Sequence, residues 1–332
     1  MPDSGVDIFE PFIHSLRLET LVLFRNIGEP FRSAFTPHIF NFRHLKSLEV
    51  DDWSIIQHLA KHEDVLAIQS LTIHFLSDSR ILPDLFSRTP ELSQLHIYRM
   101  ELVEPITFSN SILPKLSFFD GPPVLARSLV QMRPIKKIWL LGSLSKSVDR
   151  FPSSLPLLGH DFWTVLGRST APVQEIIMPR HLYDTGSLHK YLPNVSILRV
   201  CWCLGNWLYE MVNSKEDLVS EVKAFCEKWP PNPSVHQIVF EFSPCADEEI
   251  FFYDLKSQHA MLCNDISPRF PNVEQVNFTS VVNWRRSSLD QTWRANIPKV
   301  KRDYFYEKAV DDQENLVDYD KCFAAVFDGN SG

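Results

Sequence analysis

One pattern of apolar positions, apolar-x-x-apolar-x-apolar, recurs along most of the chain. Because the last two apolar residues of each copy are two positions apart, they would share one face of a short strand. The first residues of the ten copies are Leu18, Leu45, Ile68, Leu92, Leu116, Ile135, Val173, Val195, Val235 and Val273. The copy at Leu116 is degenerate. The pattern therefore predicts ten short strands separated by connecting segments.

The intervals between successive copies indicate the fold class. They are 27, 23, 24, 24, 19, 38, 22, 40 and 38 residues. Most of the short ones fall in or near the range of roughly 20–29 residues that is typical of leucine-rich repeats. One repeat cannot bury its apolar face alone, so repeats stack. We expect an α/β leucine-rich-repeat solenoid, with a curved parallel sheet, helices on its convex side and irregular repeats.

Helices are predicted between several of the copies. Residues 51–64 begin with Asp and carry apolar residues at helical spacing. Prolines bound short helical patterns at 81–90 and 123–132, and the long intervals hold helical patterns at 214–229 and about 246–264. Asn26 and Cys203 stand at the repeat position whose side chain bonds a neighbouring turn.

The predicted solenoid covers residues 1–284 in about ten repeats. Residues 285–332 lack the pattern and change from basic, around Arg285, to acidic, around Asp311. We expect a C-terminal cap or a partly disordered tail there, with charge pairing inside it favoured over contact with nucleic acid or lipid headgroups.

Composition excludes several classes of function. The net charge of −8 does not suggest nucleic acid as a partner, which needs a basic excess. No apolar run reaches about 18 residues, so no membrane contact is expected. The start does not read as a signal peptide, and the six cysteines are expected as free thiols. These features favour a cytoplasmic or nuclear protein.

Candidate chemistry is sparse. Cys201, Cys203, Cys226 and His236 lack the paired spacing of a zinc site. The sequence contains no phosphate-binding glycine loop and no nucleophile motif. We therefore expect no metal, no cofactor and no enzymatic activity. An enzyme whose site is built from the inserts at 141–172 or 205–233 stays open, and it would require a deep pocket with convergent titratable groups.

The segment LPKLSFFDGPPVLARSLVQMRPIKKIWL at 113–140 and the Pro-led strand entries resemble fungal F-box/leucine-rich-repeat-like proteins. The resemblance covers roughly residues 10–285. It implies the substrate-recognition part of an SCF-type ubiquitin ligase receptor, with a protein client on the concave face. The first repeat begins near Leu18, so we expect no F-box in this chain; a Skp1-like adaptor would bind only if an F-box lies upstream. A stand-alone repeat scaffold is the alternative.

Strand alternation places the candidate binding residues. The positions between and after the buried residues of each copy would face the concave surface. Aromatic residues and Arg dominate interface energetics. The predicted partner-binding residues are His74, His96, Tyr98, Trp139 and Arg199.

Overall fold

The computed structural model describes residues 17–24, 39, 44–100, 106–140, 143–144, 160–179, 188–201, 215–241, 255–278, 282–289 and 291–296. The fold is α/β, with open and mostly parallel sheet structure. The chain divides into two compact units, Met1–Val173 and Gln174–Gly332. Asn26 and Cys203, whose side chains were predicted to bond neighbouring turns, lie outside the described residues.

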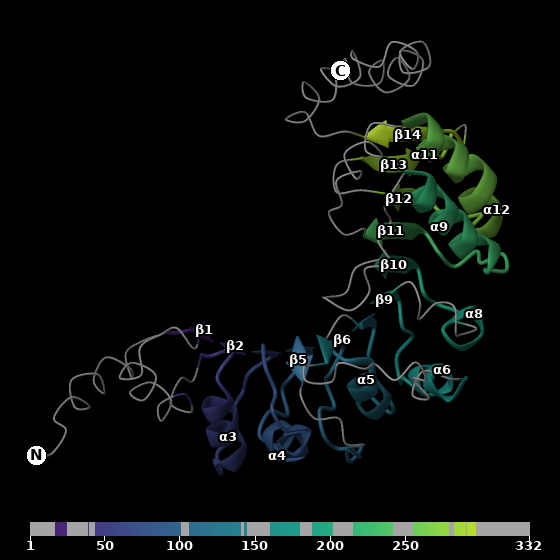
Figure 1. Ribbon diagram of the computed structural model, residues 1–332. Coiled ribbons are helices and arrows are strands. Elements are labelled where there is room, and N and C mark those ends of the chain that lie inside the picture. Colours follow the sequence, from purple (N-terminus) through teal and green to yellow (C-terminus); the bar gives the residue numbers. More distant parts are fainter. Residues whose placement is uncertain are drawn as a thin grey trace, which may run out of the picture. The chain divides into compact units, whose positions relative to one another are not determined.

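The sheet of the first unit follows chain order. Its described strands are β1 (Thr20–Leu23), β2 (Ser47–Val50), β3 (Ser70–Ile73), β4 (Gln94–Ile97), β6 (Phe118–Asp120) and β7 (Lys137–Trp139) (Figure 1). Neighbours in this order pair in parallel. Each strand lies within one of the segments that the sequence pattern predicts. A short second sheet pairs β5 (Arg99–Met100) with β8 (Ser143–Leu144).

The core of this unit is built from apolar residues in register. Leu48, Leu71, Leu95, Phe119 and Ile138 are paired across adjacent strands, and each is fully buried. Their side chains therefore form one continuous row beneath the sheet. Burial of such a row on folding is the main source of stability for stacked strands, since no single strand can bury its apolar face alone.

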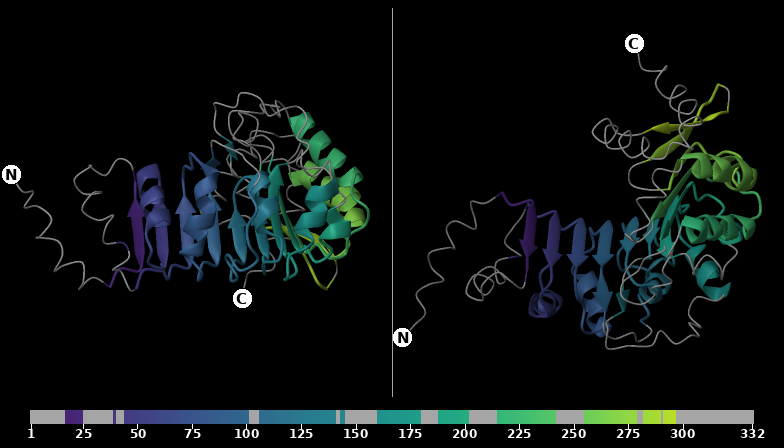
Figure 2. Two further views of the ribbon diagram at one scale, coloured as in Figure 1. Left: turned by 90° about the horizontal axis from the view of Figure 1, so that it is seen from below. Right: turned by 45° about the horizontal axis from the view of Figure 1, so that its top comes forward.

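Helices cover that apolar face. They include α3 (Trp53–Lys61), α4 (Leu82–Ser87), α5 (Pro123–Leu129) and α6 (His160–Leu166), with a 3₁₀ turn, η2 (Ser79–Ile81), before α4. In Figures 1 and 2, α3, α4 and α5 lie on the same side of the strands. The predicted helices at 51–64, 81–90 and 123–132 are confirmed. In α3, Asp52 caps the first turn through Ser54 N at 2.8 Å, and Ile55, Ile56 and Leu59 are buried.

The second unit also pairs its strands in chain order. Its parallel strands are β9 (Glu175–Pro179), β10 (Ile197–Cys201), β11 (Gln237–Glu241) and β12 (Gln275–Asn277). Its helices include α8 (Leu188–Tyr191), α9 (Lys215–Glu227), α11 (Leu255–Met261) and α12 (Ser267–Arg269), and a π-helical turn, η5 (Leu262–Ile266), joins α11 to α12. The predicted helix at 214–229 is confirmed. Only the second half of the one predicted at 246–264 falls in the described residues.

The described end of the second unit contains a feature that the sequence pattern did not predict. Strands β13 (Asn283–Arg286) and β14 (Trp293–Asn296) form an antiparallel hairpin on β12. The buried Trp284 donates its indole N–H to Gln258 at 2.7 Å. The predicted boundary between residues 284 and 285 thus falls inside β13; residues 297–332 lie outside the described residues.

None of the helices in the described segments combines the length and the hydrophobicity that crossing a bilayer requires.

Candidate functional site

The sheet of the first unit brings alternate residues of successive strands into rows. Register pairs Val22, Glu49, Thr72, His96, Asp120 and Trp139 in order across β1, β2, β3, β4, β6 and β7. These residues lie between the buried apolar positions, so their side chains point to the opposite face of the sheet. Phe24, Asp51, His74 and Tyr98 follow two positions later on the first four strands.

Six rings on this face form a chain of contacts, which we call the His–aromatic strip. The ring centroids are separated by 5.4 Å for Phe24–His74, 5.1 Å for His74–Tyr98, 6.2 Å for Tyr98–His96, 4.8 Å for His96–Phe118 and 4.8 Å for Phe118–Trp139. Tyr98 is 44% exposed and Phe24 40% exposed, and both are among the most exposed large hydrophobic side chains of the described residues. The strip therefore combines exposed rings with neighbouring rings that hold their orientation.

Carboxylates fix the two histidines of the strip. Glu49 Oε1 lies 2.6 Å from His74 Nε2, and Asp120 Oδ2 lies 3.2 Å from His96 Nδ1. Each pair joins different strands, so the ring positions are tied to the sheet register. A third carboxylate, Asp51, makes no hydrogen bond or ion pair with a described residue, and its Oδ1 atom is buried.

Asp120 is the most buried of these acids. The residue is 3% exposed, and only one of its carboxylate oxygens is hydrogen-bonded, since Oδ1 has no donor among the described residues. The adjacent Gly121 leaves no room for a side chain, because an added Cβ would lie 2.8 Å from the Phe119 ring.

These charges act on Tyr98. Burial raises the pKa of its phenol above the ordinary value, and the negative charges of Asp120 and Glu49 raise it further. The phenol therefore stays protonated and available as a hydrogen-bond donor. The contributions of Asp120 and Glu49 to this shift place two negative charges close enough to act on the phenol.

Arg199, the fifth residue predicted to bind a partner, belongs to the second unit. Its Nε atom lies 3.6 Å from Glu175 Oε1, and its Nη1 atom lies 3.6 Å from Glu241 Oε1. Glu241 also accepts a hydrogen bond from Cys201 Sγ at 3.1 Å. The guanidinium is thus already matched by two carboxylates of its own unit, which reduces what it can offer to a partner.

The structure brings His74, His96, Tyr98 and Trp139 together, while Arg199 forms a separate cluster with its two acids. Sequence reasoning missed Phe118 and Asp120. Both lie in the degenerate copy at Leu116, but counting positions from Leu116 would have placed them on the same face as His96. Their positions within the copy, rather than their residue types, would have identified them.

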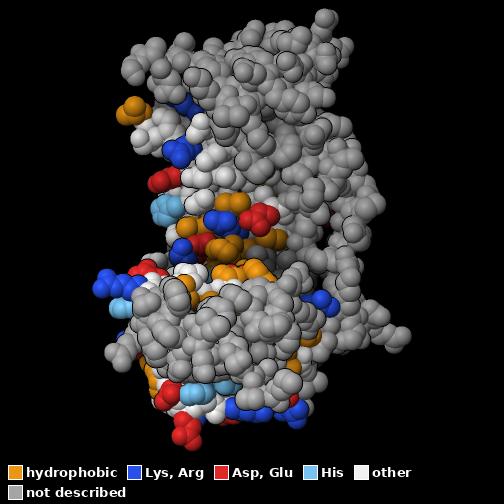
Figure 3. All heavy atoms as spheres, turned by 90° about the vertical axis from the view of Figure 1, so that its left-hand side faces the viewer, with side chains coloured by type: hydrophobic (Ala, Val, Ile, Leu, Met, Phe, Trp, Pro, Cys, Tyr) orange, Lys and Arg blue, Asp and Glu red, His pale blue; other side chains and the backbone are white. Residues whose placement is uncertain are grey.

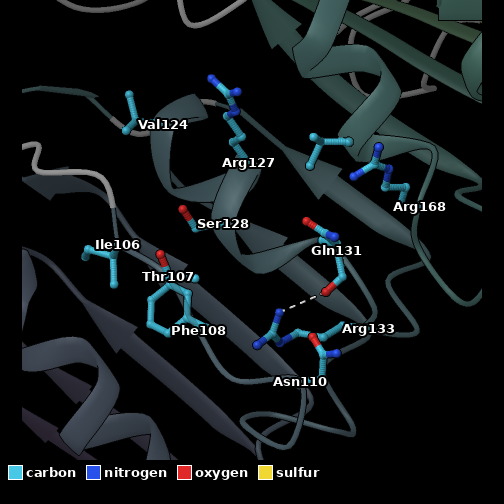
Figure 4. A pocket seen from close by; sticks show the side chains of 11 residues that line it. Ile106, Thr107, Phe108, Asn110, Val124, Arg127, Ser128, Gln131, Arg133 and Arg168 are labelled. Carbon is cyan, nitrogen blue, oxygen red and sulfur yellow. Dashed lines mark hydrogen bonds between the residues drawn. The ribbon is translucent and has the colours of Figure 1, made fainter.

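A groove of about 600 Å³ lies elsewhere in the first unit (Figure 4). It is lined by Ile106, Thr107, Phe108, Asn110, Val124, Arg127, Ser128, Gln131, Arg133, Val165 and Arg168. This lining includes no carboxylate, histidine or cysteine. The described residues of the groove therefore supply no general base or activated nucleophile for an enzymatic reaction.

Metal-ligating side chains do not gather in the described part of the chain, where no group of three or more His, Cys, Asp or Glu residues could hold an ion. The ring of His58 in α3 and the ring of His62, which follows the helix, lie 5.7 Å apart, but they belong to no group of three possible ligands among the described residues. In the view of Figure 3, hydrophobic side chains gather next to acidic and basic ones near the middle of the face shown. A mixed surface of this kind is usual for contacts between proteins.

The sequence was compared with protein-family models and with curated proteins, and neither comparison gave a match. The site itself therefore carries the inference about function.

Proposed function

We propose that this chain is a protein-binding module whose contact surface is the His–aromatic strip of the first unit. The observation that carries the proposal is the continuous chain of ring contacts from Phe24 to Trp139, which joins side chains of strands far apart in sequence. Exposed aromatic side chains held by their neighbours are typical anchors of protein interfaces, because little conformational entropy is lost when they are buried.

The shape of the strip favours a protein partner over a small molecule. A small ligand is usually enclosed in a concave pocket, whereas the strip extends over six strands of a sheet. The acidic residues beside the strip, Glu49, Asp51 and Asp120, also disfavour nucleic acid, since phosphates would be repelled. An extended surface with aromatic anchors and polar neighbours fits a folded protein or an extended segment of one.

The wider context of this proposal is a leucine-rich-repeat module of an SCF-type ubiquitin ligase receptor. Two features support it: strands of the first unit that pair in chain order, in copies of the pattern 19–27 residues apart, and the resemblance of residues 113–140 to F-box/leucine-rich-repeat-like proteins. In that context the strip would hold the client, and adaptor binding would require an F-box outside the sequence described. A repeat scaffold without a role in ubiquitination is the second candidate, and the same surface would serve it.

The test compares partners captured by the full chain and by a variant of the strip. Phe24→Ala with Tyr98→Ala removes two exposed rings, so the fold should be retained. We expect proteins that the unchanged chain captures from cells to be lost from this double variant, as quantified by mass spectrometry. Val65→Ala, at a residue that is 57% exposed outside the strip, is the matched control and should retain them.

Two outcomes would contradict the proposal: the double variant captures the same proteins as the control, or no captured protein distinguishes the two. Co-purification of a Skp1-like adaptor separates the two contexts. An adaptor that accompanies the client supports the ligase receptor, whereas a client without one supports the scaffold.

A further inference from the structure

The charges on the face of the His–aromatic strip are unbalanced. Glu49, Asp51 and Asp120 contribute three carboxylates to the two rows that carry the strip. Lys137, which pairs with Phe118 in the sheet register, is the one Lys or Arg that the described strands β1–β7 place on this face. Apart from the histidines, the described residues of these strands therefore place three carboxylates and one cation on this face, which makes it acidic.

Of the three carboxylates on this face, that of Asp120 is the most buried. A buried carboxylate is costly unless cations and hydrogen bonds compensate it. Here His96 is its one hydrogen-bond partner among the described residues, and Oδ1 has none. A cation placed over the neighbouring rings would be attracted to this charge, and the attraction is stronger than between two fully exposed charges because the carboxylate itself is shielded from water.

The rings add a second attraction for a cation. The face of an aromatic ring attracts Arg and Lys through its quadrupole. Tyr98 has an exposed ring, lies within contact distance of both histidines of the strip, and is in the negative potential of Glu49 and Asp120. Aromatic and acidic groups therefore converge on one point of the face.

We propose that the partner presents an Arg- or Lys-bearing segment to the His–aromatic strip, with a cationic side chain placed over Tyr98 and near Glu49, Asp51 and Asp120. This inference rests on the proposed function of the same surface and adds the chemistry of the partner.

The probe is a library of random dodecamer peptides displayed on phage and selected on the full chain. Peptides that bind should be enriched in Arg or Lys next to an apolar residue. Their affinity should fall about tenfold for Glu49→Gln with Asp51→Asn, which keeps the side-chain shapes and removes two charges. Glu91→Gln, which removes a carboxylate paired with Lys115 outside the strip, should leave the affinity unchanged.

Two failures are distinguishable. If selected peptides lose binding to Phe24→Ala with Tyr98→Ala but are not cationic and do not respond to loss of the two carboxylates, the strip binds proteins and the inferred chemistry is wrong. If no selected peptide depends on the two rings, the proposed function itself is contradicted. Weaker binding at higher salt is expected only for the cationic peptides.

Discussion

Arg133 shows how a single residue organises one connection of the first unit. It is 1% exposed, and its guanidinium donates to the backbone carbonyls of Ser109, Ile112, Leu129 and Gln131 at 2.8–3.0 Å. Figure 4 shows it beside Gln131 and Asn110. Burial lowers the pKa of Arg133, but an arginine remains charged at physiological pH. The planar fork thus ties the end of α5 to the loop at 109–112.

We predict that Arg133→Met lowers the free energy of unfolding by about 3 kcal/mol, because four carbonyls lose a charged donor and some remain buried. Equilibrium urea unfolding measures the change. Arg127→Met, on the same helix, is the control: its side chain makes no hydrogen bond to a described residue, and a change within about 0.5 kcal/mol is expected. Equal losses for the two variants would refute the structural role of Arg133.

Residue-level chemistry was only partly predictable from the sequence. Alternation along the strands identified His74, His96, Tyr98 and Trp139 as sharing a face, because a period of two requires no tertiary information. The contact of Asp120 with His96 and two of the four carbonyl contacts of Arg133 join residues more than 20 positions apart. Such long-range partners leave no local pattern, so the sequence alone could not reveal them.

At the scale of elements, the parallel strands were predictable from the sequence, whereas the hairpin at the described end of the second unit was not. Apolar residues at positions one, four and six locate the parallel strands of the main sheet structure described here, except that the copy containing β6 has Gly121 at position six. The hairpin of β13 and β14 escaped because its buried residues, Trp284, Trp293 and Ala295, follow an alternation without the leading apolar position. A search for the repeat pattern therefore predicted a cap or a partly disordered tail from residue 285, without identifying the two antiparallel strands that cover the last parallel one.

Helix α3 carries a pH dependence. Burial lowers the pKa of His58, and the nearby His62 lowers it further. Above about pH 6.5 His58 is neutral in both the folded and the unfolded chain. As pH falls below that value, the unfolded chain binds the proton more readily, so the folded state loses stability until its own lowered pKa is reached.

We predict that His58→Gln reduces the fall in thermal midpoint between pH 7.5 and pH 5.5. Differential scanning calorimetry at both pH values gives this fall for the variant and for the unchanged chain. His236→Gln, at an exposed histidine of the second unit, controls for the loss of a histidine as such. If the thermal midpoint falls by the same amount between the two pH values for His58→Gln and for the unchanged chain, His58 does not contribute to the acid sensitivity.

For the whole molecule, pairing in chain order predicts that a destabilising substitution affects mainly the strands next to it. Each internal parallel strand contacts the strands that precede and follow it in its unit, so stability is carried largely by nearest neighbours. The chain also divides into two compact units, so the expectation can be tested in each unit separately.

We predict that Leu198→Ala, at a fully buried position of β10, costs about 3 kcal/mol and increases hydrogen exchange mainly in β9, β10 and β11. Mass spectrometry of the exchanged peptides should show β2 and β3 almost unchanged. Leu71→Ala in β3 is the reciprocal variant and should produce the opposite distribution. A uniform rise in exchange across both units for either variant would show that the chain unfolds as one cooperative body instead.

The ordered pairing of the strands also bears on synthesis at the ribosome. Ser47, Ser70 and Gln94 are successive partners in the sheet register, so each new strand emerges some 24 residues after the strand that receives it. At roughly 5–20 residues per second, a new strand arrives every few seconds, whereas closure of a short loop takes well under a millisecond. The growing chain can therefore dock each strand before the next is translated. Until then, one parallel edge stays open to chaperones.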